Sequence, residues 1–109
     1  MNNTEFNQVS VIKEANVHFD GQCISHTILF EDGQKKMLGV ILPTGERSLS
    51  FKTHTSERME IVSGECEVWI EGKPGFVAYR TGQSFLVKGK SEFQIRTDRI
   101  INYVCHLEG

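Results

Sequence analysis

Apolar and polar side chains alternate along most of the chain. Cys66, Val68 and Ile70 alternate with charged or aromatic neighbours, and Phe93 and Ile95 alternate with polar ones. A period of two places every second side chain on one face of a β-strand. The helical spacing of three and four never persists for a dozen residues. The pattern therefore predicts short β-strands over nearly the whole chain.

Turns interrupt these runs, and each turn pairs a polar residue with a glycine. Glycine adopts the positive φ angles and tight bends that such turns need. The turns recur about every ten residues, the spacing of short strands in a sandwich or barrel. They lie at Asp20-Gly21, Asp32-Gly33, Thr44-Gly45, Ser63-Gly64, Glu71-Gly72 and Lys88-Gly89. We expect one all-β domain over residues 1–109, an antiparallel barrel or jelly roll of roughly six to eleven strands with little helix.

Charge and composition argue against several classes of protein. The chain has 12 basic and 14 acidic residues and a net charge of −2, which disfavours a nucleic-acid or anionic-membrane surface. No segment approaches the roughly 20 apolar residues of a membrane span, and the polar amino terminus lacks a signal-peptide run. We therefore expect a cytoplasmic protein. Cys23, Cys66 and Cys105 are widely spaced and odd in number, which predicts buried reduced thiols.

The segment from 51 to 64 has the spacing of a metal site without its histidines. Small metal-binding β-barrels carry a His-x-His pair, three or four further residues, a ligand glutamate and then a turn glycine. Here Glu57 and Gly64 keep that spacing, but Phe51 and Thr53 stand in place of the histidine pair. Phe93 stands where the third histidine is expected. One carboxylate does not hold a transition metal, which needs three or four ligands, so we expect no metal.

Most of the chain resembles the pyrimidine/purine nucleoside phosphorylase family of small bacterial cupins. The similar stretches are 13–43, 51–68, 81–96 and 103–105, and the most specific string is ERMEIVSGE at 57–65. The resemblance implies a cupin-like fold, usually in a homodimer, that works without a metal or other cofactor. It also implies phosphorolysis of a broad range of purine and pyrimidine nucleosides to free base and (deoxy)ribose 1-phosphate. Inorganic phosphate is then the co-substrate, and nucleoside salvage is the setting.

Glu57 is the carboxylate that we expect to act in catalysis. It occupies an inward ligand position with no metal to neutralise it, and burial without a partner raises the pKa of a carboxylate. The alternative is that Glu57 pairs with an Arg or Lys of the barrel or caps the turn. Thr53 shares that face by alternation and offers a hydroxyl to substrate or phosphate. Its alternative is an ordinary strand residue.

Aromatic residues at the former ligand positions suggest a stacking surface for a base. Phe51 and Phe93 replace ligands, and Tyr103 of the last strand is expected to join them. Every base has a π-face, so such a surface tolerates different bases. The alternative is that all three side chains belong to the core, where phenylalanine is among the most buried residues.

The phosphate site has no phosphate-binding loop, so side chains or scattered amides must hold the anion. His26 and Lys36 are favoured because relatives frequently place cations at these positions. Most of the other cations are expected to be solvated surface charges. The full candidate set is Arg58, Arg80, Arg96, Lys35, Lys36, Lys88 and Lys90, with Ser25, His26 and Ser91 as helpers.

Two other classes of function stay open at this point. One is a metal-free cupin that binds a small ligand without turnover, which is also compatible with the lost histidines. The other is a metal-dependent isomerase or dioxygenase that uses His54, Glu57 and another histidine.

Overall fold

The computed structural model describes residues 4–108, which form eleven β-strands and one turn of 3-10 helix. The elements in chain order are β1 (Ser10–Val11), β2 (Asn16–His18), η1 (Phe19–Gly21), β3 (Cys23–Leu29), β4 (Lys35–Ile41), β5 (Leu49–Lys52), β6 (Ser56–Ser63), β7 (Glu65–Ile70), β8 (Val77–Arg80), β9 (Ser84–Val87), β10 (Glu92–Arg96) and β11 (Ile101–Glu108).

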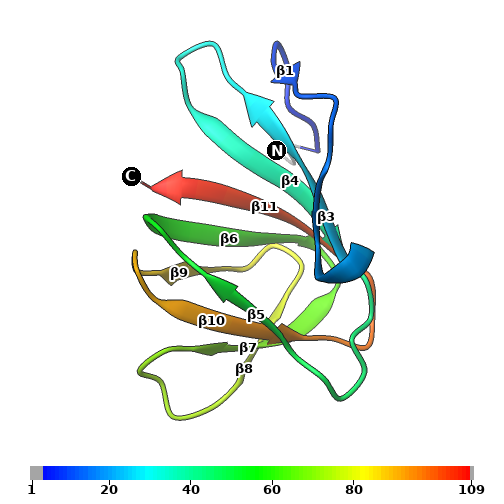
Figure 1. Ribbon diagram of the computed structural model, residues 1–109, viewed down its shortest axis with the longest axis vertical. Helices are drawn as coiled ribbons and strands as arrows, with labels where there is room; N and C mark the ends of the chain where they lie inside the picture. The colour runs from blue at the N-terminus through cyan, green and yellow to red at the C-terminus, as the bar shows by residue number, and fades with distance from the viewer. Residues whose placement is uncertain (1–3, 109) are drawn as a thin grey trace.

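The strands form two antiparallel sheets that face one another (Figure 1). The large sheet has seven strands in the order β1-β3-β4-β11-β6-β9, with β2 paired to β3. The small sheet has four strands in the order β5-β10-β7-β8. The expected all-β, cupin-like fold is confirmed as a jelly roll, whose two sheets do not close into a continuous barrel.

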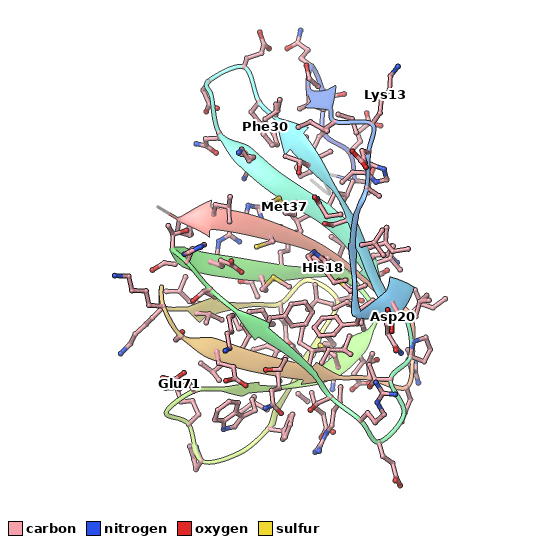
Figure 2. All side chains as sticks on the ribbon, in the orientation of Figure 1. Lys13, His18, Asp20, Phe30, Met37 and Glu71 are labelled. Atoms are coloured by element: carbon pink, nitrogen blue, oxygen red, sulfur yellow. The ribbon has the colours of Figure 1, made fainter. Side chains whose placement is uncertain are left out.

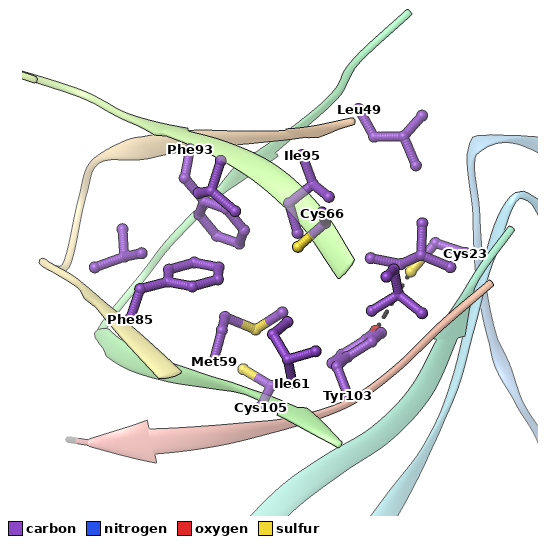
Figure 3. Packing of buried hydrophobic residues seen from close by; sticks show 14 residues of the cluster. Cys23, Leu49, Met59, Ile61, Cys66, Phe85, Phe93, Ile95, Tyr103 and Cys105 are labelled. Carbon is purple, nitrogen blue, oxygen red and sulfur yellow. Dashed lines mark hydrogen bonds between the residues drawn. The ribbon is translucent and has the colours of Figure 1, made fainter. Parts of the chain in front are cut away.

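The core lies between the sheets and is filled by the inward positions of their strands. Met59 and Ile61 alternate on β6, and Phe93 and Ile95 alternate on β10, as the period of two predicts. Figure 3 shows the rings of Phe85 and Phe93 meeting in this core, with centroids 5.7 Å apart. Burying one such large apolar side chain stabilises the fold by about 1.5–3 kcal/mol.

The last strand, β11, joins the two halves of the large sheet. It pairs with β4 on one side and with β6 on the other. Its inward side chains include Tyr103, which lies across β4 at Gly39. A Cβ at Gly39 would meet the Tyr103 ring at 2.6 Å, so only glycine leaves room for this ring. The Tyr103 hydroxyl ends 3.3 Å from the sulfur of Cys23 on β3 (Figure 3).

The three cysteines are buried and free, as expected. Burial raises the pKa of the Cys23 thiol. It also raises the pKa of Cys66 to about 11, with a smaller contribution from the charge of Glu65. The Cys105 thiol is affected most, because the charge of Glu57 adds to the effect of burial.

None of the helical structure within residues 4–108 is both long and apolar enough to cross a membrane.

We expect Gly39→Ala to destabilise the fold by about 1–3 kcal/mol, the range for overpacking a well-filled core. The added methyl would force the Tyr103 ring or β4 to move. Urea unfolding followed by circular dichroism measures the change. Gly75→Ala is the matched control, because nothing lies within 4 Å of its added Cβ, and should stay within about 0.5 kcal/mol of wild type. Equal midpoints for the two variants would contradict the packing argument.

Candidate active site

The core between the two sheets is bordered by side chains that remain partly exposed. On one side, the partly exposed ring of Tyr79 on β8 lies 4.9 Å from the ring of Phe85 on β9. On the other side, the inward side chains of Met37, Phe51 and Leu107 pack on the core but remain partly exposed. These three side chains come from β4, β5 and β11. We call the region between them the open side.

Glu57 lies at the open side, on the inner face of the large sheet. In the sheet, Glu57 pairs with Leu107 of β11 and with Val87 of β9. Its side chain lies on the same inner face of β6 as that of Met59. The Sγ of Cys105 donates a hydrogen bond to Glu57 Oε1 at 3.3 Å. Burial raises the pKa of Glu57, and this hydrogen bond opposes the rise.

No ion pair of Glu57 is found within residues 4–108. The alternative of a structural salt bridge therefore finds no support in that part of the chain. The negative charge of a half-buried carboxylate is poorly stabilised when its hydrogen-bond partner is a thiol, because a neutral thiol is a weak donor. Such a group is available to a cationic or hydroxyl-bearing ligand.

Thr53 is buried, but it lies in the turn after β5 and not in the strand. Its hydroxyl donates to the carbonyl oxygen of Lys88 at 2.6 Å and accepts from the amide of Ser91 at 3.0 Å. These bonds tie the end of β5 to the turn before β10. The expected contact of Thr53 with substrate stays a prediction, and in this structure its hydroxyl holds the turn.

The three aromatic residues expected to form a stacking surface, Phe51, Phe93 and Tyr103, lie in or against the core. Phe51 stacks on Phe93 with centroids 5.1 Å apart and planes at 12°. Phe93 is only 1% exposed and Tyr103 only 6%, so both belong to the core, which is the alternative weighed for them. Phe51 alone of the three is partly exposed at the open side.

His26 and Lys36 lie on the outer face of the large sheet, away from Glu57. His26 lines an apolar hollow of about 450 Å³ formed by Ile24, Leu38, Gly39, Val40 and Asn102. Lys36 Nζ lies 2.7 Å from Nδ1 of His106, whose Nε2 lies 2.8 Å from Glu60 Oε1. The structure therefore does not bring these two candidates together with the carboxylate.

His106 is held neutral by its surroundings. Burial lowers its pKa, the charges of Lys36 and Arg58 lower it further, and Glu60 opposes them. A neutral imidazole accepts from the Lys36 ammonium at Nδ1 and donates to Glu60 from Nε2.

A second hollow of about 530 Å³ lies beside the small sheet and is lined by both acidic and basic side chains. Its Arg96 pairs with Glu67 at 2.9 Å and lies 3.8 Å over the ring of Phe76. Arg96 is thus engaged with its own sheet and points away from the candidate carboxylate.

Asn16, Ser25 and Thr27 form a polar strip on the inner face of the large sheet. Of these residues, only Ser25 was a candidate from the sequence. The amide nitrogen Nδ2 of Asn16 donates to the hydroxyls of Ser25 and Thr27, each at 3.3 Å. Thr27 in turn donates to the sulfur of Met37, which Figure 2 places on β4. Strand alternation also puts Lys35, and not Lys36, on the face of Met37.

Cys105 is the second residue that the sequence analysis did not connect with the site. Its side chain points inward from β11 (Figure 3) and reaches Glu57. The signal was available in principle, because Tyr103 and Cys105 share one face of a strand. Their pairing with Glu57 depends on the register between β6 and β11, which the sequence does not display.

Within residues 4–108, no three His, Cys, Asp or Glu side chains lie close enough to hold a metal ion. Metal independence itself stays a prediction.

Solved structures resemble this one over nearly the whole chain. A protein of unknown function from Acinetobacter sp. ADP1 is 59% identical, with a TM-score of 0.93 over 95% of this chain and 98% of the other. A protein of unknown function from Vibrio parahaemolyticus is 31% identical, with a TM-score of 0.79 over 89% of this chain and 97% of the other. The hydroxypropylphosphonic acid epoxidase from S. wedmorenis, 9% identical with a TM-score of 0.69 over 93% of this chain and 56% of the other, shares the fold alone.

Sequence relatives lead to the family. Proteins called pyrimidine/purine nucleoside phosphorylase are 59% identical over all of both chains in Acinetobacter baumannii. A protein called pyrimidine/purine nucleoside phosphorylase 1 is 53% identical over all of both chains in Psychrobacter cryohalolentis. The model of the pyrimidine/purine nucleoside phosphorylase family matches residues 13–107. The chain therefore belongs to the pyrimidine/purine nucleoside phosphorylase family.

Proposed function

We propose that this protein cleaves purine and pyrimidine nucleosides with inorganic phosphate, without a metal and with broad specificity. The observation that carries the proposal is the half-buried carboxylate of Glu57, which faces the open side and takes part in no ion pair within residues 4–108. Membership of the family supplies the reaction class. The products are the free base and ribose or deoxyribose 1-phosphate.

The chemistry requires a negative charge near the ribose. As the bond between C1′ and the base nitrogen breaks, the electron pair leaves with the base, and positive charge builds on the ribose ring. A phosphate oxygen then forms the new bond to C1′, and the base takes up a proton. A fixed carboxylate stabilises the developing cation and holds ribose hydroxyls in place. Glu57 is assigned this role, and Cys105 orients its Oε1.

The neighbours of Glu57 have positioning and binding roles in the proposal. Thr53 fixes the turn at 88–91, and Phe51 supplies apolar surface at the open side. The strip of Asn16, Ser25 and Thr27 offers amide and hydroxyl groups on the same inner face. His26 and Lys36 fall outside this site because they lie on the outer face.

Assembly as a homodimer is also part of the proposal. The outer face of the large sheet carries exposed apolar side chains, among them Ile24, Leu38 and Val62. The polar groups beside them are engaged within the chain, since neutral His106 donates to Glu60 and accepts from Lys36, and Arg58 pairs with Glu108. An apolar face whose polar groups are engaged in this way is suited to packing against an identical face.

The direct test uses chelator-treated protein with inosine or uridine, with and without phosphate. Release of free base that depends on phosphate supports the proposal. Nucleoside binding without release would favour a cupin that only binds a ligand. Release restored only by added metal would favour a metal-dependent enzyme and overturn the assignment.

We expect Glu57→Gln to slow phosphorolysis by roughly 10²-fold or more, the range for removing one preorganised electrostatic group. The side-chain volume is kept, so the fold should persist. Steady-state kinetics with inosine measures the loss. Glu60→Gln is the matched control, because Glu60 is on the same strand but faces outward to His106; it should retain nearly the wild-type rate.

The same variant makes a prediction about stability. The folded protein raises the pKa of Glu57, so burial favours its protonated form. Wild-type stability should therefore fall as pH rises from the ordinary glutamate pKa through the raised one, and Glu57→Gln should lack this fall. Thermal melts across that pH range test the sign. A variant that melts lower than wild type at neutral pH would instead indicate a structural role for the charge.

Cys105→Ala should move the acid limb of the pH–rate profile to higher pH. The thiol hydrogen bond lowers the pKa of Glu57, so its removal lets that pKa rise further, and the active carboxylate is lost earlier on acidification. The profile of kcat/KM for inosine measures the shift. Cys66→Ala is the control, since Cys66 is equally buried and belongs to the opposite sheet. Superimposable profiles for wild type and Cys105→Ala would contradict the role of the thiol.

For the homodimer, light scattering at micromolar concentration should give twice the mass of one chain. Leu38→Glu should lower it to the monomer mass, because an unpaired charge would enter the buried apolar face. Val77→Glu places the same charge at an exposed position of the small sheet and should leave the dimer intact. A monomer mass for the wild-type protein would refute the proposed assembly.

A further inference from the structure

A strained turn at η1 presents an exposed aromatic ring at the open side. Phe19 and Asp20 have φ angles of 53° and 55°, and Gly21 follows with 95°. Glycine adopts such angles freely and aspartate is enriched there, but a bulky aromatic residue in this region is an outlier. Residues held in this way concentrate at ligand-binding sites and switches.

The surrounding backbone holds the turn in place. The amide of Gln22 donates to the carbonyl oxygen of Phe19 at 3.1 Å. The amide of Leu42 donates to the carbonyl oxygen of Gln22, and the side-chain Nε2 of Gln22 donates to the carbonyl oxygen of Pro43. The turn is therefore fastened to the end of β4. In Figure 2, Asp20 marks this turn.

The fixed backbone sets the ring of Phe19 against Phe51 across the open side. Their centroids lie 5.2 Å apart with planes at 76°. Phe51 in turn stacks on Phe93, which is buried. The aromatic series thus runs from the core to the surface and ends at Phe19, which is 41% exposed.

The ring of His18 also lies near Phe19, with centroids 6.5 Å apart and planes at 51°, and the 41% exposure of Phe19 leaves part of its ring accessible to a flat ligand. In an edge-to-face pair, one ring presents its edge to a face of the other. Whichever ring presents the edge, Phe51 covers at most one face of Phe19. Phe93 and Tyr103 have no such free face, because they are 1% and 6% exposed.

We infer that Phe19 is the stacking platform for the nucleobase of the substrate. The inference rests on the proposed function and adds the residue that recognises the base. The strained turn holds the ring against Phe51, one of the side chains that border the open side. In the proposal, the base lies on Phe19 and the ribose extends from there toward Glu57. Stacking uses the π-face that every purine and pyrimidine has, so it serves both classes of base without selecting between them.

The kinetic test compares Phe19→Leu with Phe19→Trp. Leucine keeps an apolar cover over Phe51 but has no π-face, whereas tryptophan restores one. We expect Phe19→Leu to raise KM for both inosine and uridine by roughly tenfold, within the range measured for one base–aromatic stack. Its kcat should change much less, and Phe19→Trp should return KM to near the wild-type value.

Phe6→Leu is the matched control for these variants. Phe6 forms a similar edge-to-face pair with Phe30, with centroids 5.1 Å apart. This pair is remote from the turn, because η1 precedes β3 whereas Phe30 comes directly after it. The KM of Phe6→Leu should equal that of wild type. An unchanged KM in Phe19→Leu, or an equal rise in Phe6→Leu, would overturn the inference.

A binding measurement separates this inference from the reaction itself. The chain has one tryptophan, so the double variant Phe19→Trp, Trp69→Phe carries its only indole at the turn. Saturable quenching of this indole by inosine and uridine without phosphate supports the stacking platform, even if the wild-type protein releases no base and the proposed function fails. Turnover by the double variant without any quenching at saturating nucleoside would refute the platform while the proposed function stands.

Discussion

The large sheet depends on β11, because this strand links β4 to β6. Its hydrogen bonds attach the hairpin of β3 and β4 to the rest of the sheet. Its inward side chains also contribute to the core and the candidate site, since Tyr103 fills the space over Gly39 and Cys105 donates a hydrogen bond to Glu57. One strand therefore sets the register of the sheet, the packing of the core and the surroundings of the candidate carboxylate. Because β11 is the last strand, these contacts join segments that are far apart in sequence, a topology that slows folding.

Much of the fold was predictable from the chain, because alternation and turn glycines are local signals. The alternation around Val68 and around Phe93 predicted strands with the correct inward faces. The inward direction of Glu57 came from the spacing of Glu57 and Gly64 and from the resemblance to a family. The assignment of strands to one sheet or the other was not visible, because sheet partnership depends on pairing between distant strands and not on local periodicity.

The candidate site was harder to predict than the fold, for a reason visible in β3. This strand carries apolar residues on both faces, with Cys23 inward and Ile24 outward, so alternation alone does not say which face is buried. His26 was nominated because relatives frequently place a cation there, and alternation did not show that its side chain lies on the outer face. Thr53 shows a second limit, since the strand ends at Lys52 and the threonine belongs to a turn. Phe19 shows a third, because no sequence pattern signals a left-handed aromatic residue.

The buried cysteines have a consequence for the chemistry of the protein in solution. Thiolates, and not thiols, react with peroxides, disulfides and alkylating reagents. Burial raises the pKa of Cys23, Cys66 and Cys105, so all three sulfurs remain protonated and shielded at neutral pH. Although the chain is rich enough in cysteine to form a disulfide, its thiols are poor targets for oxidants. The folded protein should therefore keep its properties through changes in redox conditions and need no reducing agent.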